Sequence, residues 1–169
     1  ALPSSHSIVR RGMARTFQHV QLVPELTVIE NVALGAYWRT ESGFVRGLLA
    51  LDAAENRQVL ASAQAALERV GLGAEADLLA ASLPLGKQRI VEIARALVAD
   101  PQILLLDEPA AGLRFSEKLT LVRILRQLQA EHVTILLVEH DMELVMGCVE
   151  RLVVLDRGRI IAQGSPADV

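Results

Sequence analysis

Two adjacent carboxylates, Asp107 and Glu108, end an aliphatic run and are the residues best placed in the sequence to do chemistry. The run, residues 103–106, has no polar alternation, which is typical of a strand covered on both faces in a parallel sheet. Ligands of such sheets bind at the carboxyl ends of strands, and successive side chains point to opposite faces. One acid can therefore hold a metal while the other handles a water molecule. The alternative is a strand that simply runs out into solvated acids.

A glycine at the start of a predicted helix offers a second kind of chemistry. Apolar residues recur after Lys87 with the spacing of one buried helical face, at Ile90, Ile93, Ala94 and Leu97. Asp100-Pro101 ends this helix, because a residue before proline is pushed out of the α region. The free N–H groups of a helix that begins at Gly86 suit an anion such as a phosphate.

Two further polar residues follow predicted strands. Gln18 comes after residues 12–17, and His140 comes after the apolar run 133–138. Taken singly, Gln18 reads as an exposed loop amide and His140 as a solvated imidazole. Their function therefore has to be judged together with the other motifs of the chain.

Together these segments resemble the ATPase subunits of ABC transporters. Residues 83–89, LPLGKQR, resemble the signature motif, and residues 103–109, ILLLDEP, resemble the Walker B strand. Phe17-Gln18 is similar to the Q-loop, and residues 138–141, VEHD, are similar to the switch-histidine segment. The amino-acid sequence of residues 15–18, 108–113 and 139–142 looks most like that of the branched-chain amino acid importers. The resemblance covers nearly the whole chain.

The resemblance implies a role for each polar residue in MgATP hydrolysis. Asp107 would hold Mg²⁺, and Glu108 would act as the general base or orient the attacking water. His140 would contact the γ-phosphate of ATP. Gln18 would touch Mg²⁺ and water while reporting to the membrane subunit. Phosphoryl transfer asks mainly for such positioning and charge stabilisation.

The resemblance also implies a head-to-tail dimer in which each subunit completes the other's site. The signature residues would contact ATP bound by the second subunit; they are Leu83, Pro84, Leu85, Gly86, Lys87 and Gln88. The D-loop would lie at the dimer interface and comprises Ala110, Ala111, Gly112 and Leu113. Two residues depart from the family pattern. Pro84 replaces a hydroxyl residue, so backbone groups must carry that phosphate contact, and Arg114 replaces an Asp or Asn.

The expected fold is α/β, a P-loop NTPase-like and mostly parallel sheet with an inserted helical subdomain. We divide the chain into a partial ATPase core with the Q-loop (1–26), a helical subdomain (27–82), and the remaining core with signature helix, Walker B, D-loop and switch histidine (83–169). Thr27 and Glu30 form a capping box that opens a helix through about Tyr37.

The remaining elements follow from periodicity and turn residues. A helix over 52–70 ends at Gly71, and residues 38–51 show little periodicity. Beyond Walker B we expect helices at 116–130 and 141–147, with a second buried strand between them at 133–138. The last predicted elements are a hairpin, 151–155 with 159–162, and the first turn of a helix at Ser165.

A phosphate loop of the form GxxxxGK[ST] is absent from the sequence. The family has this loop before the Q-loop, where this chain has seventeen residues. Our expectation is that the sequence begins partway through a domain, and the alternative is a natural protein that has lost the loop.

Composition restricts the competing functions. The formal charge of −3 offers no basic field for nucleic acid, which counts against an ABC-type ATPase acting on DNA or ribosomes. No apolar run approaches the roughly 18 residues of a membrane span. The leading function, implied by the resemblance, is an importer ATPase for branched-chain or other amino acids at the cytoplasmic face of the membrane, partnered by permease subunits and by no nucleic acid. A non-hydrolysing interaction module, or an importer for another solute, stays open.

Overall fold

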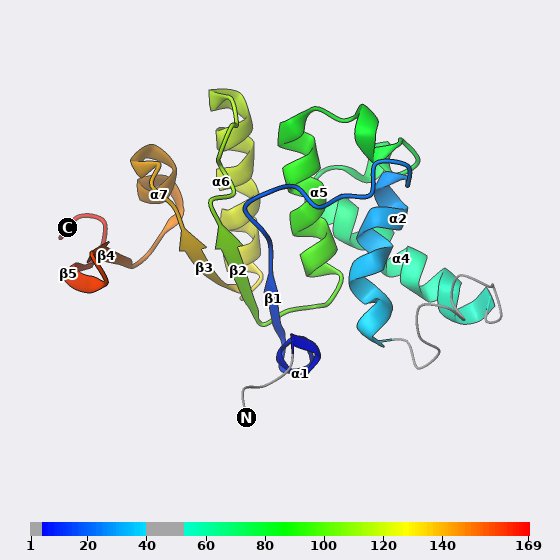
Figure 1. The fold of residues 1–169 in the computed structure, drawn as a ribbon, viewed down its shortest axis with the longest axis horizontal. Coiled ribbons are helices and arrows are strands. Elements are labelled where there is room, and N and C mark those ends of the chain that lie inside the picture. The colour runs from blue at the N-terminus through cyan, green and yellow to red at the C-terminus, as the bar shows by residue number, and fades with distance from the viewer. Residues whose placement is uncertain (1–4, 40–52) are drawn as a thin grey trace.

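A computed structural model describes residues 5–39 and 53–169 and has the predicted α/β architecture. Three parallel strands form a sheet in the order β1 (Met13–Arg15), β2 (Ile103–Asp107) and β3 (Thr134–Val138) (Figure 1). Arg15 pairs with Leu105, and Asp107 pairs with Val138. The carboxyl ends of β2 and β3 therefore lie side by side, which brings the segments of Glu108 and His140 together.

A helical segment lies between β1 and β2 in sequence and beside the sheet in space (Figure 1). Its elements are α2 (Val28–Ala33), η1 (Leu34–Arg39), α4 (Ala53–Arg69), η2 (Gly73–Glu75), η3 (Ala80–Ser82) and α5 (Leu85–Leu97). The Thr27–Glu30 capping box forms as predicted, and Gly71 has the positive φ of a helix terminator. An isolated antiparallel bridge joins Thr27 to Leu79. It closes the part of the segment that we assigned to a helical subdomain, and the three-part division stays a prediction.

The second half of the chain follows the predicted order. α6 (Phe115–Ala130) lies between β2 and β3 in sequence, and α7 (Met142–Cys148) begins at the Asp141 cap. β4 (Leu152–Asp156) and β5 (Arg159–Gly164) form an antiparallel hairpin that stands apart from the three-stranded sheet (Figure 1). A short helix, α1 (Ser5–Arg10), precedes β1 and was not predicted.

The core lies on one face of the sheet only. Leu104 and Leu106 are fully buried there, in one cluster with residues of α5 and α6. On the opposite face Leu136 and Val138 are 58% and 56% exposed. The prediction that both strands are buried on both faces is therefore wrong for this chain. The physical reason is that, within the described residues, helices pack against a single face.

Two predictions concern the least regular parts of the chain. Most of the segment 38–51 falls in residues 40–52, which lie outside the described residues, while residues 38 and 39 belong to η1. At the other end, the Ser165 hydroxyl and N–H both donate to Asp168 Oδ2, at 2.5 and 3.2 Å. The residues that follow Ser165 form a turn and not a helix.

Candidate active site

Gln18, Glu108 and His140 meet at the carboxyl edge of the sheet. Gln18 Nε2 donates a hydrogen bond to Glu108 Oε2 at 2.8 Å, and His140 Nδ1 lies 3.7 Å from Glu108 Oε1. The His140 side chain is 75% exposed and that of Glu108 is 30% exposed. An amide, a carboxylate and an imidazole thus surround one point that solvent can reach.

The backbone after β2 directs Glu108 to this point. Glu108 has a φ of +46°, in a region that costs a residue other than glycine of order 1–3 kcal/mol. Its N–H donates to Val138 O at 2.9 Å, which extends the ladder between β2 and β3 by one residue. Strain of this kind persists only where the surroundings hold it. The hydrogen bond to Val138 O and the one from Gln18 Nε2 do so here.

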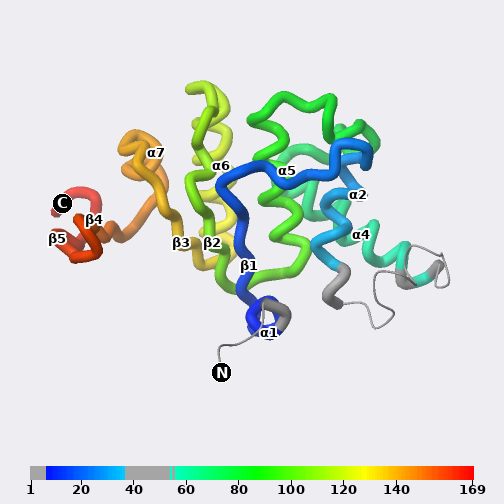
Figure 2. Tube along the Cα trace, in the orientation of Figure 1, coloured from blue at the N-terminus to red at the C-terminus, as the bar shows by residue number. Residues whose placement is uncertain are grey.

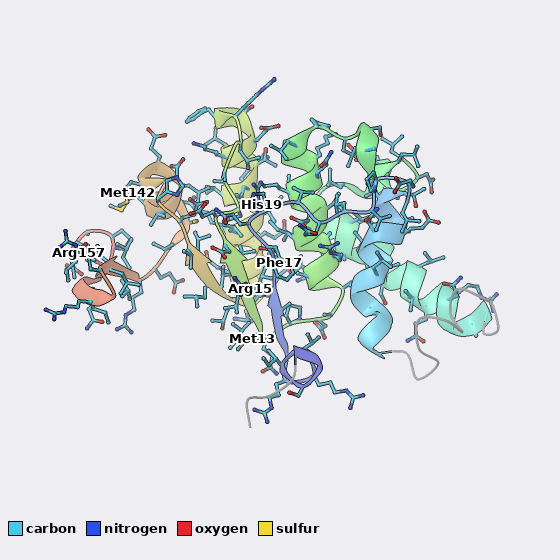
Figure 3. The ribbon with its side chains drawn as sticks, in the orientation of Figure 1. Met13, Arg15, Phe17, His19, Met142 and Arg157 are labelled. Carbon is cyan, nitrogen blue, oxygen red and sulfur yellow. The ribbon has the colours of Figure 1, made fainter. Side chains whose placement is uncertain are left out.

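Asp107 faces a different neighbour, Arg15 of β1. Arg15 Nη2 donates to Asp107 Oδ2 at 3.0 Å, and the guanidinium lies 5.8 Å from the centre of the Phe17 ring. Figure 3 labels Arg15 and Phe17 at the end of β1 and His19 just beyond. An open cavity of about 410 Å³ lies there, lined by Arg15, Phe17, Gln18, His19, Gln21 and Asp107.

Glu139 is a site residue that our sequence reasoning missed. Its side chain is 1% exposed. Oε1 accepts a hydrogen bond from Ala110 N at 2.8 Å, and Oε2 accepts from His140 N at 3.1 Å. A single buried carboxylate therefore ties the start of the D-loop to the backbone of the switch histidine. Its position directly after the predicted strand 133–138, beside His140, could have pointed to it.

The signature segment forms the first turn of α5, as predicted, two residues earlier than the apolar period indicated. Pro84 is the N-cap and makes no side-chain cap bond. The backbone N–H groups of the first turn of α5 therefore receive no bond from the N-cap side chain. Gly86 is buried, and a Cβ there would collide with the Glu117 carboxyl group of α6. Gln88 Nε2 donates to Leu83 O at 2.8 Å, and Lys87 pairs with Glu75.

The two groups of predicted residues stay apart in this chain. None of the described signature residues, 83–88, makes a hydrogen bond or ion pair with Gln18, Asp107, Glu108 or His140. In the D-loop, Ala110 and Leu113 turn inward at 3% and 9% exposure. Ala111 is half-buried, and Gly112 is exposed.

Fold and site together define an ATP-binding cassette. The family model for ABC transporters matches residues 2–111, and the chain belongs to this family. Relatives that it resembles include the high-affinity branched-chain amino acid transport ATP-binding proteins LivG of Salmonella typhimurium (45% identity over 96% of this chain) and of Escherichia coli K12 (44% over 96%). The corresponding protein BraF of Pseudomonas aeruginosa is 40% identical over 97% of the chain. The chain covers 65% of the length of these LivG proteins and 66% of BraF.

Solved structures give the same assignment. A nucleotide-free ATP-binding cassette from an ABC transporter superposes with a TM-score of 0.82 at 29% identity, over 96% of this chain and 64% of that one. A cassette in its ADP conformation gives a TM-score of 0.81 at 28% identity, over 98% and 65% of the two chains. These likenesses confirm the P-loop NTPase-like α/β fold.

Proposed function

We propose that this chain is part of the ATP-hydrolysing subunit of an importer for branched-chain amino acids. The observation that carries the proposal is the meeting of Gln18, Glu108 and His140 at the carboxyl ends of parallel strands. The names of the LivG and BraF relatives supply the solute class. The site alone supports only a carboxylate, Glu108, placed to act as a general base.

The oxygen atoms that could act as metal ligands at the site fit Mg²⁺. The described residues contain no cluster of three or more His, Cys, Asp or Glu side chains that could hold a metal. Mg²⁺ needs no such cluster, because it is commonly held by one or two carboxylates together with water and substrate phosphates. Asp107 is a partly exposed carboxylate, and the Gln18 amide has a carbonyl oxygen. When bound by Asp107 and Gln18, Mg²⁺ would neutralise charge on the phosphates.

The three polar side chains divide the work of hydrolysis. A water attacks the γ-phosphorus of ATP, the bond from that phosphorus to the β,γ-bridging oxygen breaks, and ADP leaves. Glu108 accepts the proton of the water, while the Gln18 N–H holds the Glu108 carboxylate in one orientation. His140, exposed beside Glu108, donates to the γ-phosphate.

The remaining contacts of the proposed subunit are with proteins. A second copy of the ATPase would present residues 83–88 to the bound ATP, with Ala111 and Gly112 at the shared surface. Permease subunits would hold the pair at the cytoplasmic face of the membrane. Among the helices that the structure describes, none is both long and apolar enough to cross a bilayer.

Two substitutions in the full-length protein test the division of labour between the carboxylates. Glu108→Gln should lower single-turnover hydrolysis by about 10²–10⁴-fold while preserving MgATP binding, because the amide cannot accept a proton. Asp107→Asn should weaken the Mg²⁺-dependent part of nucleotide binding. Glu131→Gln, which alters an exposed carboxylate paired with Arg69, is the matched control and should hydrolyse ATP at the parent rate. Parental hydrolysis by Glu108→Gln, or the same defect in both variants, would refute the assignment.

A further inference from the structure

The loop that carries Gln18 is bound to α5 through the backbone at two places. Gln18 O accepts a hydrogen bond from Arg89 Nη1 at 2.9 Å. Three residues later, Gln21 O accepts from Arg95 Nη1 at 2.7 Å, and Gln21 N donates to Glu92 Oε1 at 2.8 Å. Figure 2 shows this stretch running from the end of β1 past α5 to α2. We call Arg89, Glu92 and Arg95 the α5 clamp.

The clamp is a built feature and not a chance surface contact. Glu92 is 3% exposed and is one of the few buried charged residues in the described chain. Arg95 Nη2 donates to Glu92 Oε1 at 3.1 Å, so the buried carboxylate has both a charged partner and a backbone donor. A buried carboxylate persists only when it is paired in this way. The three residues lie three apart along one face of α5, where they follow the loop.

We propose that Glu92, Arg95 and Arg89 are positioning residues that fix the loop of Gln18 to the helix opened by the signature segment. The proposal deepens the proposed function and rests on it. Gln18 bonds Glu108 with its side chain while Arg89 holds its carbonyl oxygen. The clamp therefore sets the position of the amide that orients Glu108.

The first measurement is amide hydrogen exchange of the full-length protein without nucleotide. Glu92→Ala removes the acceptor of Gln21 N–H, and exchange in residues 18–23 should become about fivefold or more faster, since one net hydrogen bond is lost. Glu92→Gln keeps an oxygen that can accept from Gln21 N and should stay within about twofold of the parent. Exchange at the β2–β3 ladder should not change in either variant. Glu131→Gln is the control, because its ion pair with Arg69 lies outside the clamp.

The second measurement separates positioning from binding. In Glu92→Ala the kcat for ATP hydrolysis should fall about tenfold or more, because misplacing a catalytic group by about 1 Å can cost 10²-fold. The KM for ATP should stay within about twofold, and Glu92→Gln should recover most of the rate. A merely structural role would not give rescue by the amide with an unchanged KM.

Several results would overturn the proposal. Parental exchange of residues 18–23 in a folded Glu92→Ala protein would do so, as would a Glu92→Gln variant as defective as Glu92→Ala. If Glu92→Ala does not fold, Arg89→Ala tests the same tether at a half-buried residue, and unchanged exchange in residues 18–23 then counts against the clamp. Failure of the proposed function looks different. The parent protein would not hydrolyse ATP, while the exchange measurement would still report the clamp.

Discussion

Asn31 of α2 holds the far end of the same loop, and its removal should cost far more than its size indicates. The side chain is fully buried. Its Oδ1 accepts from Val23 N at 2.8 Å, and its Nδ2 donates to Val23 O and to Thr27 O, each at 3.0 Å. One amide therefore satisfies both backbone groups of Val23 and anchors the turn that leads into α2.

The cost of Asn31→Ala follows from these bonds. Val23 N–H would lose its acceptor, and because Val23 is 39% exposed this loss counts as one net hydrogen bond, about 0.5–1.5 kcal/mol. The two donated bonds contribute about 0.5–1.5 kcal/mol each. We expect a loss of about 1.5–4.5 kcal/mol in the free energy of unfolding. Asn31→Asp keeps the acceptor for Val23 N but loses both donors, so it should also destabilise the protein.

Urea unfolding of the full-length protein measures the effect. The matched control is Asn56→Ala, the same substitution at an exposed position of α4. This change should stay within about 0.5 kcal/mol of the parent or stabilise slightly, because Ala is the better helix former. A loss below about 1 kcal/mol for Asn31→Ala would refute the reasoning, because it would mean that solvent satisfies Val23 without the amide.

Two further predictions concern Glu139 and Glu30. Glu139→Ala leaves Ala110 N–H without its acceptor, and urea unfolding should show a loss of about 1–3 kcal/mol together with slower single-turnover hydrolysis, whereas parental values for both would contradict the role of Glu139. The Thr27 hydroxyl, and then the Thr27 N–H, lower the pKa of Glu30. The stability that Glu30 contributes is therefore present above the unfolded pKa of about 4.3 and is lost as the pH falls through the folded pKa. Glu30→Gln should flatten that part of the acid dependence of the unfolding free energy; an unchanged dependence would contradict it.

Local patterns predicted the elements well, because their causes lie within a few residues. The apolar spacing after Lys87 and the Pro101 stop correctly indicated α5. Thr27 and Glu30 form the predicted capping box, and Asp141 caps α7. The burial of β3 was predicted wrongly for the complementary reason. An aliphatic strand without alternation does not reveal whether one or two layers cover it, since that depends on elements distant in sequence.

The candidate site shows the same difference between features with local causes and features with distant ones. The end of an aliphatic strand pointed to Asp107 and Glu108, and the family resemblance added Gln18 and His140. The bonds that hold these residues could not be found in this way. Glu139 reaches Ala110 across 29 residues of sequence, and no local pattern encodes such a contact. When a side chain bonds a backbone group, the residue type that supplies the backbone group also gives no signal of that bond in the sequence.

The loop that carries Gln18 is therefore held more by the helices than by the sheet. After Thr16, whose N–H still bonds Leu105 O, the backbone bonds of the loop go to the α5 clamp, to Asn31 and to the segment before α5. Among the described residues of the loop, the Gln18 side chain alone bonds the end of β2. The orientation of the Glu108 carboxylate thus depends on a bond from Gln18, a residue whose backbone is itself held by α5.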